Sequence, residues 1–396
     1  MDFCCENCGR VYKQKYHYEK HIKRKYPCKK IDKIDKLVNN QINLIINLNK
    51  THINNMKKQL GQFYTKNYDY ILQNIYIPQN IKNIIEPFAG EGDLIEYINK
   101  SGNKYSVNMY DIDPKKANII QRDTLRNPPE YKEQFVITNP PYLARNKSDN
   151  KQIYDKYNVN DLYKCFIVNI INNPCNGGIL IIPLNFISST RKNDVLLRER
   201  FLSIYSIIQL NIFEEQVFSD TSCTVCSLLF NTNINNDITN DINIDIYPSK
   251  INIKTKLIKE NNYTIGGDIY NLVKNDTYKI KRLITKNLSE KNTNIVIKCI
   301  DDTSKSMIRA EYVNEEKIFI DTTPKCSARG YLTLIIKPQI NEDKQKKLVK
   351  NFNEYLSVNR TKYNSLFLAN FRESNDIARK RISFDLVYKI IGHLID

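Results

Sequence analysis

The sequence predicts an α/β fold for the centre of the chain, with a small cysteine-containing module before it and a mixed α+β region after it. Three observations support this architecture. A buried strand at 81–85 runs through a glycine turn into a helix at 95–100. The first 28 residues contain closely spaced Cys and His residues. After residue 263, short alternating runs, including 295–300, 317–320 and 331–336, suggest strands and precede two helical patterns, at 342–355 and 376–395. Glycine turns between strand and helix are typical of nucleotide-binding α/β units.

The composition excludes disorder and integral membrane insertion. Apolar residues make up 41% of the 396 residues, enough for a sizeable core. The longest mostly apolar stretch, 177–187, falls short of the roughly 20 residues that a membrane-spanning helix needs. The N-terminus carries no apolar segment of a secretory signal. We therefore expect an intracellular protein, cytoplasmic or nuclear, in which the ten cysteines are free thiols or metal ligands.

Positive charge is concentrated at the N-terminus. The chain has a net charge of +17, and residues 1–60 hold 14 Lys and Arg against 5 Asp and Glu. A basic block is typical of proteins that bind a polyanion, most often nucleic acid. A solvated basic tail is the alternative interpretation.

Residues 1–30 have the ligand spacing of a small zinc module. Cys5 and Cys8 are separated by two residues, His21 follows after twelve, and Cys28 follows after six more. A β-turn that presents two thiolates and a helix that presents a histidine are typical of zinc fingers. The segment resembles a C2H2-type finger in which Cys28 replaces the second histidine. The long gap before Cys28 leaves the fourth ligand open, with His17 as the competitor.

Residues 31–58 are expected to form a helical connector. Apolar residues recur at steps of three and four for about three heptads. This seam fits packing on the rest of the protein. The alternative is a short coiled coil through residues 31–52, which would make a homodimer.

Polar residues end three consecutive strands predicted in the central segment. The first strand runs into Glu86-Pro87-Phe88-Ala89-Gly90-Glu91-Gly92. The second, at 105–110, ends at Asp111, with Asp113 as a rival acid, and Asp123 follows a short apolar step. The strand at 135–138 ends in Asn139-Pro140-Pro141-Tyr142. A carboxylate at the tip of the second strand is where a ribose diol is commonly held.

These motifs resemble those of the gamma class of N6-adenine DNA methyltransferases, over residues 59–232. The match includes Gly61-Gln62-Phe63-Tyr64-Thr65, the helix from Asp161, a strand at 177–188, and Glu215 to Phe218 with the strand at 221–230. The resemblance implies a Rossmann-like domain that binds S-adenosylmethionine, and a target-recognition domain at 233–396. Residues 233–260 are rich in Asn, Asp, Ile and Lys, which suggests a connector with an exposed strand. Segments 61–65 and 86–92 would hold the methionine part of the cofactor, and Asp111 would accept hydrogen bonds from its ribose. Asp123 would accept from the exocyclic amine of the cofactor's adenine, and Ile112 and Phe166 would sandwich that adenine. The implied cofactor residues are Phe63, Thr65, Glu86, Pro87, Ala89, Gly90, Gly92, Asp111, Ile112, Asp123, Asn139 and Phe166.

The catalytic motif suits methyl transfer to an amine. The resemblance makes Asn139, Pro140, Pro141 and Tyr142 catalytic, with Phe218 as a second aromatic platform. An adenine amine is a poor nucleophile, and the oxygens of the Asn139 side chain and the Pro140 backbone can accept its two hydrogens. This orients the nitrogen lone pair toward the methyl donor. The base must leave the duplex, so stacking on Tyr142 and Phe218 is expected.

Three functions fit these residues. The first is site-specific methylation of double-stranded DNA, with a structural zinc finger that adds DNA affinity. The second is N6-adenine methylation of RNA, which the same motifs would serve. The third is methylation of protein glutamine, against which the basic finger and the 160-residue C-terminal region argue. The sequence contains no evident fused nuclease.

Overall fold

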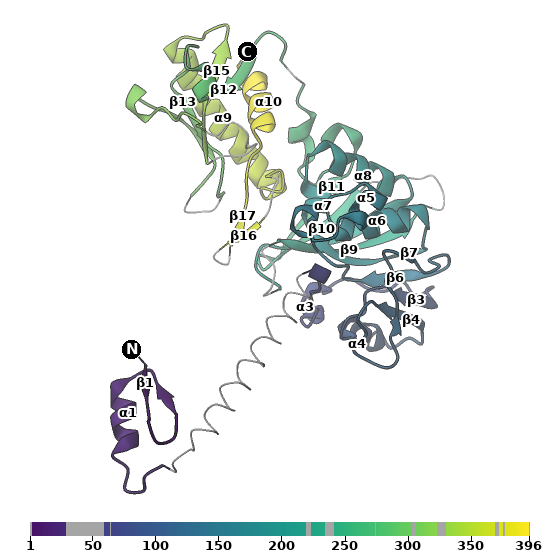
Figure 1. Ribbon diagram of the computed structural model, residues 1–396. Helices are drawn as coiled ribbons and strands as arrows, with labels where there is room; N and C mark the ends of the chain where they lie inside the picture. The colour runs from purple at the N-terminus through teal and green to yellow at the C-terminus, as the bar shows by residue number, and fades with distance from the viewer. Residues whose placement is uncertain are drawn as a thin grey trace. The chain divides into compact units, whose positions relative to one another are not determined.

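The computed structural model divides the chain into two units, Met1–Leu60 and Gly61–Asp396, drawn in Figure 1. It describes residues 2–28, 59–63, 65–218, 223–233, 241–273, 275–302, 306–322, 330–368, 372–374 and 377–395. The expected connector at 31–58, with its proposed coiled coil, lies outside the described residues, as do Tyr64, Thr221 and Ser222.

The N-terminal unit begins with a small ββα module. Strands β1 (Phe3–Cys4) and β2 (Val11–Tyr12) pair antiparallel, and α1 (Lys15–Ile22) follows. Between the strands, the Cys5 amide donates to the Arg10 carbonyl and the Gly9 amide to the Cys5 carbonyl. These two bonds close the turn that carries Cys5 and Cys8, the first half of the predicted metal site.

A mixed nine-stranded sheet forms the core of the second unit. Its strand order is β11-β10-β8-β9-β7-β6-β3-β4-β5. The strands are β3 (Asn83–Glu86), β4 (Ser106–Asp111), β5 (Ile120–Gln121), β6 (Phe135–Thr138), β7 (Gly177–Pro183), β8 (Tyr205–Phe213), β9 (Val225–Thr232), β10 (Asp241–Tyr247) and β11 (Ile251–Lys256). Strands β5, β4, β3, β6 and β7 are parallel neighbours, and β9 is antiparallel to β7 and β8. The predicted Rossmann-like α/β fold is confirmed.

The order of the strands explains where a site should form. From β3 the chain crosses to β4 on one side, and β6 then pairs with β3 on its other side. Ligands in open α/β sheets bind at the carboxyl ends of strands where the order reverses in this way. Here those ends are Glu86 and Thr138, the latter directly before Asn139.

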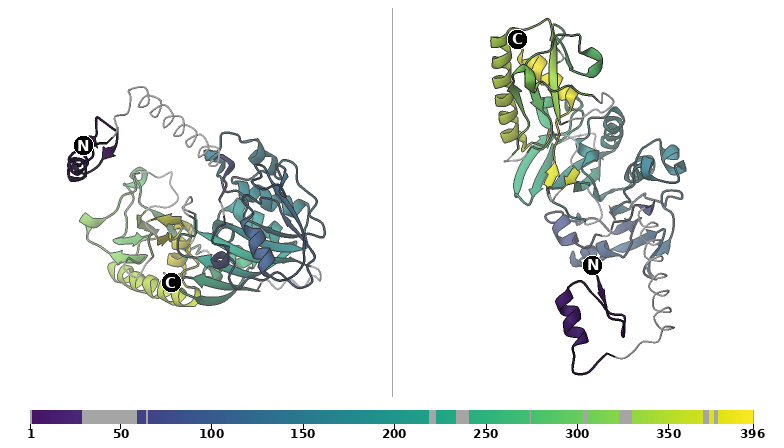
Figure 2. Two further views of the ribbon diagram at one scale, coloured as in Figure 1. Left: turned by 90° about the horizontal axis from the view of Figure 1, so that it is seen from below. Right: turned by 60° about the vertical axis from the view of Figure 1, so that its left-hand side comes forward.

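Helices connect or follow the strands of this sheet (Figures 1 and 2). They are α3 (Tyr68–Ile71), α4 (Asp93–Lys100), α5 (Gln152–Tyr157), α6 (Leu162–Asn172), α7 (Asn185–Ser188) and α8 (Lys192–Leu202), with a 3-10 turn η1 (Arg145–Lys147). The expected single strand at 177–188 is wrong in its second half, where α7 begins two residues after Pro183. Proline lacks the amide that a continuing ladder would need.

The sheet continues beyond residue 232. The sequence suggested a connector with an exposed strand at 233–260, but β10 pairs with β8 and β11 pairs with β10. In β10, Ile242, Ile244 and Ile246 are buried, and their spacing of two places them on one face of the strand. This alternation, hidden among Asn and Asp, is what attaches the segment to the core.

A second hydrophobic core lies in the C-terminal region, where a four-stranded sheet packs with two helices. The sheet has the order β12 (Lys279–Arg282), β15 (Tyr331–Lys337), β13 (Ile295–Lys298), β14 (Arg309–Tyr312). Helix α9 (Glu342–Tyr363) runs along this sheet, as the right-hand view of Figure 2 shows. It contacts β14 and helix α10 (Phe384–Leu394). Leu334, Phe352 and Ile390 are among its fully buried residues. The α+β character expected for this region is confirmed.

Two expectations in the C-terminal region are wrong. Residues 317–320 do not form a strand, because both backbone groups of Phe319 bond the side-chain hydroxyl of Thr333 instead of a ladder. The helix expected from 376 begins only at Phe384, where the Ser383 hydroxyl accepts the Leu386 amide at 3.2 Å and caps it. A short hairpin of β16 (Arg372–Ser374) and β17 (Ile377–Arg379) precedes it.

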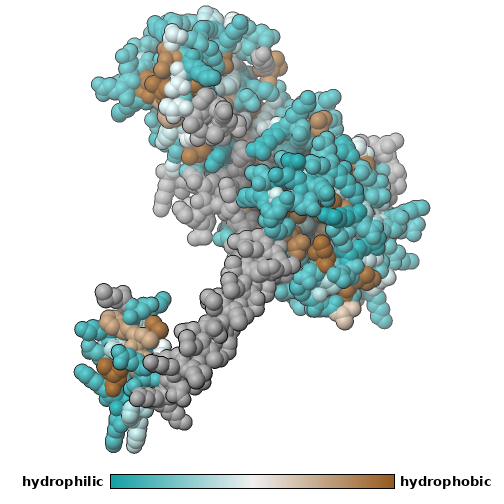
Figure 3. All heavy atoms as spheres, in the orientation of Figure 1, coloured by the Kyte–Doolittle hydropathy of each residue, from teal (hydrophilic) through white to brown (hydrophobic). Residues whose placement is uncertain are grey.

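Among the coloured residues, the face of the molecule seen in Figure 3 is mostly polar, with small hydrophobic areas. In the N-terminal module, Val11, Ile22 and the rings of Tyr16 and Tyr26 are exposed. Within the part of the chain that the structure describes, no helix combines the length and apolar character needed to cross a bilayer.

Candidate active site and metal cluster

A cavity lies where β3 and β6 end. Its lining comes from four places in the chain: the segment before α3, the turn after β3, the start of α4, and the end of β6. The lining residues are Phe63, Thr65, Glu86, Phe88, Ala89, Gly90, Asp93, Leu94 and Asn139. The empty space within it, open solvent included, amounts to about 240 Å³. Six of the twelve residues in the two segments predicted to hold the methionine part therefore line one cavity.

The turn after β3 is built by two glycines in left-handed conformation. Gly90 has φ 54° and Gly92 has φ 76°, values that favour glycine. Gly92 is the N-cap of α4, and the first two residues of that helix line the cavity. The first backbone amides of a helix have no partner within the helix. The Gly90 amide donates to Asp111 Oδ2 at 2.8 Å, which ties this turn to the end of β4.

Glu86 is buried with an unpaired oxygen. Its side chain lines the cavity, and its Oε2 atom makes no hydrogen bond. Burial, aided by the charges of Asp93 and Asp111, raises the pKa of Glu86 well above its usual value of 4.5. A buried carboxyl group without a partner is costly, and a cation at this place would relieve that cost.

The acids after β4 and β5 differ in their surroundings. Asp111 is buried, and its two oxygens accept the amides of Gly90 and Asp113 at 2.8 Å each. The rival Asp113 is exposed and pairs with Lys115. Asp123 pairs with Arg126 at 3.3 Å, and the neighbouring Thr124 hydroxyl donates to the Pro87 carbonyl at 2.9 Å.

The two residues expected to sandwich the cofactor's adenine lie in different surroundings. Ile112 is 40% exposed, directly after β4. Phe166 on α6 is fully buried, and its ring meets that of Phe88 edge-on at 5.3 Å. Phe88 itself lines the cavity, so Phe166 lies behind the wall that Phe88 forms.

The Asn139 side chain is held on both sides. Its Nδ2 donates to the Phe63 carbonyl at 2.9 Å and to Thr65 Oγ1 at 3.0 Å. Its Oδ1 accepts a short hydrogen bond from the Tyr142 hydroxyl. That hydroxyl also lies 2.5 Å from the Ile181 carbonyl on β7. Since a phenol has one proton, it can donate to only one of these two acceptors at a time.

Tyr142 is not an open platform in this structure. It is 6% exposed, and Phe218 is 7% exposed. The ring of Phe63 stacks on Tyr142, with centroids 5.2 Å apart and planes at 28°. The sequence offered no signal for this contact, because Phe63 and Tyr142 lie far apart along the chain.

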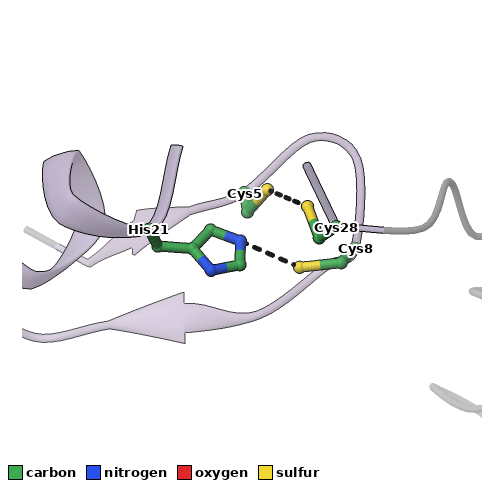
Figure 4. Close-up of side chains that lie close together, drawn as sticks. All are labelled: Cys5, Cys8, His21 and Cys28. Carbon is green, nitrogen blue, oxygen red and sulfur yellow. Dashed lines mark hydrogen bonds between the residues drawn. The ribbon is translucent and has the colours of Figure 1, made fainter. Parts of the chain in front are cut away.

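In the N-terminal module, the predicted ligands converge (Figure 4). The ligand atoms of Cys5, Cys8, His21 and Cys28 all lie within 4.8 Å of one another. Cys5 Sγ is 3.6 Å from Cys28 Sγ, and Cys8 Sγ is 3.2 Å from His21 Nε2. Tetrahedral zinc with its usual bond lengths separates ligand atoms by about 3.5–3.8 Å. The donor set fits zinc, and the distance between Cys5 and Cys28 lies within this range.

The surroundings of the cluster distinguish its ligands from their neighbours. His17 and Cys4 are exposed and lie outside the cluster. Backbone hydrogen bonding at Cys8 lowers the pKa of Cys5 to about 6, whereas burial and the neighbouring thiols raise the pKa of Cys28 to about 11. The Tyr12 ring lies 5.2 Å from that of His21, and Phe3, which sequence reasoning missed, stacks on Tyr18 at 5.9 Å.

Comparison with known proteins gives one curated relative. No family model matches the chain. Over 206 residues the chain is 25% identical to Type II methyltransferase M.AccI of Acinetobacter calcoaceticus. The alignment covers 44% of this chain and 37% of the relative, so the chain spans well under half of that protein's length.

Several solved structures align with about half of the chain. The type I restriction-modification system methyltransferase subunit from Streptococcus thermophilus aligns with a TM-score of 0.35 and 12% identity, over 46% of this chain and 47% of that one. The type I restriction enzyme EcoKI M protein aligns with a TM-score of 0.34 and 16% identity, over 48% and 50%. TM-scores this low do not decide the fold, which rests on the strand order above.

Proposed function

We propose that the chain is a methyltransferase that moves a methyl group from S-adenosylmethionine to the N6 amine of an adenine in double-stranded DNA. The observation that carries the proposal is the meeting of Glu86 and Asn139 in one cavity at the reversal of strand order. The likeness to a type II methyltransferase supports it. So does the net charge of +17, which suits a nucleic-acid substrate.

The cavity residues fit S-adenosylmethionine. The unpaired Glu86 oxygen suits the ammonium of the methionine part, because a charged donor there would satisfy it. The left-handed Gly90 turn lets backbone approach the ligand, and Asp111 suits the ribose hydroxyls. Asp123, Ile112 and Phe166 are proposed for the adenine end of the cofactor. When bound, the cofactor supplies the electrophilic methyl group.

As the base enters, a hydrogen bond from the base would replace the one that the Tyr142 hydroxyl now donates to Asn139 Oδ1. The amine of the base would donate to Asn139 Oδ1 and to the Pro140 carbonyl. The Tyr142 hydroxyl can give up Asn139 without losing a partner, because the Ile181 carbonyl lies 2.5 Å away. The two acceptors hold the amine hydrogens, so that its lone pair faces the methyl donor. No acidic base is required, since the proton can leave N6 after transfer.

The N-terminal module would bind one structural zinc through Cys5, Cys8, His21 and Cys28 and add affinity for DNA. Lys20, Lys23 and Arg24 lie on or just after α1, where they can contact phosphates. Arg24 Nη2 contacts His21 Nδ1. A histidine that binds zinc through Nε2 carries its proton on Nδ1, so Arg24 would turn away from the loaded site and become free for phosphate.

Labelled S-adenosylmethionine, offered with DNA, RNA or protein, tests the proposal. We expect label in duplex DNA, recovered as N6-methyladenine. Asn139→Ala should lower methyl transfer at least roughly 10²-fold, the scale of losing one preorganised polar contact, while the variant still binds cofactor. Asn103→Ala removes an exposed asparagine that does not line the cavity and should act as wild type. N4-methylcytosine, methylated RNA alone or methylglutamine as product would contradict the proposal.

A further inference from the structure

Phe63 fills the space beside the predicted base platform. Its ring stacks on Tyr142 at 5.2 Å and lies 6.4 Å from the ring of Phe218, tilted by 45°. Phe63 thus contacts both aromatic residues proposed to hold the target base. Tyr163 meets Tyr142 edge-on at 6.2 Å, and Tyr142 is almost fully buried. No exposed face of Tyr142 remains on which a base could stack.

The segment that carries Phe63 is tied to the catalytic turn on both sides of the ring. The Tyr142 amide donates to the Gly61 carbonyl at 2.9 Å. The Asn139 side chain donates to the Phe63 carbonyl and to Thr65 Oγ1. These bonds fix the backbone around Phe63, while its ring remains partly exposed at the cavity. Side-chain rotation is therefore the simplest way to uncover Tyr142.

We infer that Phe63 occupies the target-base site in the free enzyme and is displaced when an adenine enters. The inference rests on the proposed function. A purine stacks on an aromatic ring through its flat face, which is the contact that Phe63 now makes. The sequence resemblance assigned Phe63 to the methionine part of the cofactor. The geometry points instead to the boundary between cofactor and base, because the same residue lines the cavity and covers Tyr142.

This placement gives Phe63 a defined effect on substrate binding. Phe63→Ala removes the ring that competes with the base. A stacked aromatic pair corresponds to a factor of about 2–10 in an equilibrium constant. The KM for DNA should fall by that factor, in the direction opposite to the weaker cofactor binding that loss of a cavity-lining side chain would cause. A variant that binds cofactor more weakly and leaves the KM for DNA unchanged would overturn the inference.

A tryptophan reporter follows the ring directly, because the chain contains no tryptophan. In Phe63→Trp, the single indole would stack on Tyr142. The probe is a duplex oligonucleotide carrying the site mapped from methylated DNA, bound in the presence of S-adenosylhomocysteine. We expect this duplex to shift the emission and to increase quenching by acrylamide. The same duplex with an abasic target position has no base to enter, so it should leave the emission unchanged.

Tyr76→Trp provides the matched control, since Tyr76 belongs to the same unit and is 74% exposed. Its emission should not distinguish the two duplexes. Equal responses of Trp at position 63 to adenine and abasic duplexes would overturn the inference, as would a response to the cofactor product alone with none to DNA. These outcomes differ from failure of the proposed function, in which the parent enzyme would transfer no methyl group to DNA.

Discussion

The backbone amide of Tyr142 donates a hydrogen bond to the carbonyl oxygen of Gly61 at 2.9 Å. This bond joins the segment before α3 to the turn after β6. The approach is so close that a Cβ atom on Gly61 would lie 2.8 Å from the Tyr142 carbonyl oxygen. Gly61 also has φ +65°, a conformation that other residues rarely adopt.

Gly61→Ala should therefore disable the site. Left-handed backbone costs a non-glycine residue about 1–2 kcal/mol, and the clash must also displace the catalytic turn. We expect methyl transfer to fall at least about 10-fold, a barrier change of about 1.4 kcal/mol or more. Gly102→Ala is the matched control, because Gly102 has φ +76° with nothing within 4 Å of the added carbon. If the two variants lose similar stability but transfer methyl groups at equal rates, the close approach of Gly61 to Tyr142 does not matter for activity.

Glu86→Gln should stabilise the free protein and weaken cofactor binding. The folded-state pKa of Glu86 is raised by burial, so the folded chain holds this proton more tightly than the unfolded chain. The resulting stability is full below the usual pKa of 4.5 and is lost as pH rises through the raised value. Glutamine stays neutral, so its thermal stability should lack this pH dependence.

Calorimetry would measure the cost to binding in the Glu86→Gln variant. Loss of a charge-assisted hydrogen bond, worth about 1.5–3 kcal/mol, should weaken S-adenosylmethionine binding by roughly 10- to 100-fold. In the parent protein, affinity should rise with pH as Glu86 ionises. Glu354→Gln changes an exposed carboxylate on α9 that pairs with Lys350 and does not line the cavity, so this variant should bind normally. Equal affinities in both variants would exclude Glu86 from the cofactor site.

Asp111→Ala should lower S-adenosylmethionine affinity by about one to two decades, since it removes an acceptor for the ribose hydroxyls. It also removes the acceptor of the Gly90 amide, so the glycine turn loses its anchor. Asp113→Ala changes an exposed acid paired with Lys115 and should retain affinity. If only the Asp113 variant binds weakly, the ribose role belongs to Asp113.

The proposed zinc site predicts a difference between two neighbouring cysteines. The parent protein should contain about one zinc per chain. Cys8→Ser removes a thiolate from the cluster and should lose the metal, whereas Cys4→Ser, whose side chain lies outside the cluster, should keep it. Metal analysis of the purified variants gives the answer. Equal zinc in all three proteins would reject the assignment.

Patterns within a few residues determined much of this protein. Three local features were sufficient to predict the α/β core. They are the spacing of apolar residues by two in strands and by three or four in helices, the turn at Gly90 and Gly92, and the acids after β4. The cysteine and histidine spacing predicted a cluster whose ligand atoms meet within 4.8 Å. These features are local because strand, turn and helix preferences depend on neighbouring residues.

Contacts between distant segments were decided only by the tertiary structure. Strand β10 joins the sheet by pairing with β8, and its Asn and Asp residues gave the segment the composition of a connector. The Phe319 amide donates to the Thr333 hydroxyl, and that hydroxyl donates to the Phe319 carbonyl. No strand pattern in the sequence could reveal these two hydrogen bonds. Phe63 covers Tyr142 because the Gly61 and Tyr142 backbones meet. Side chains brought together by folding leave no periodic signal in the sequence, so the stacking of Phe63 on Tyr142 became visible only in three dimensions.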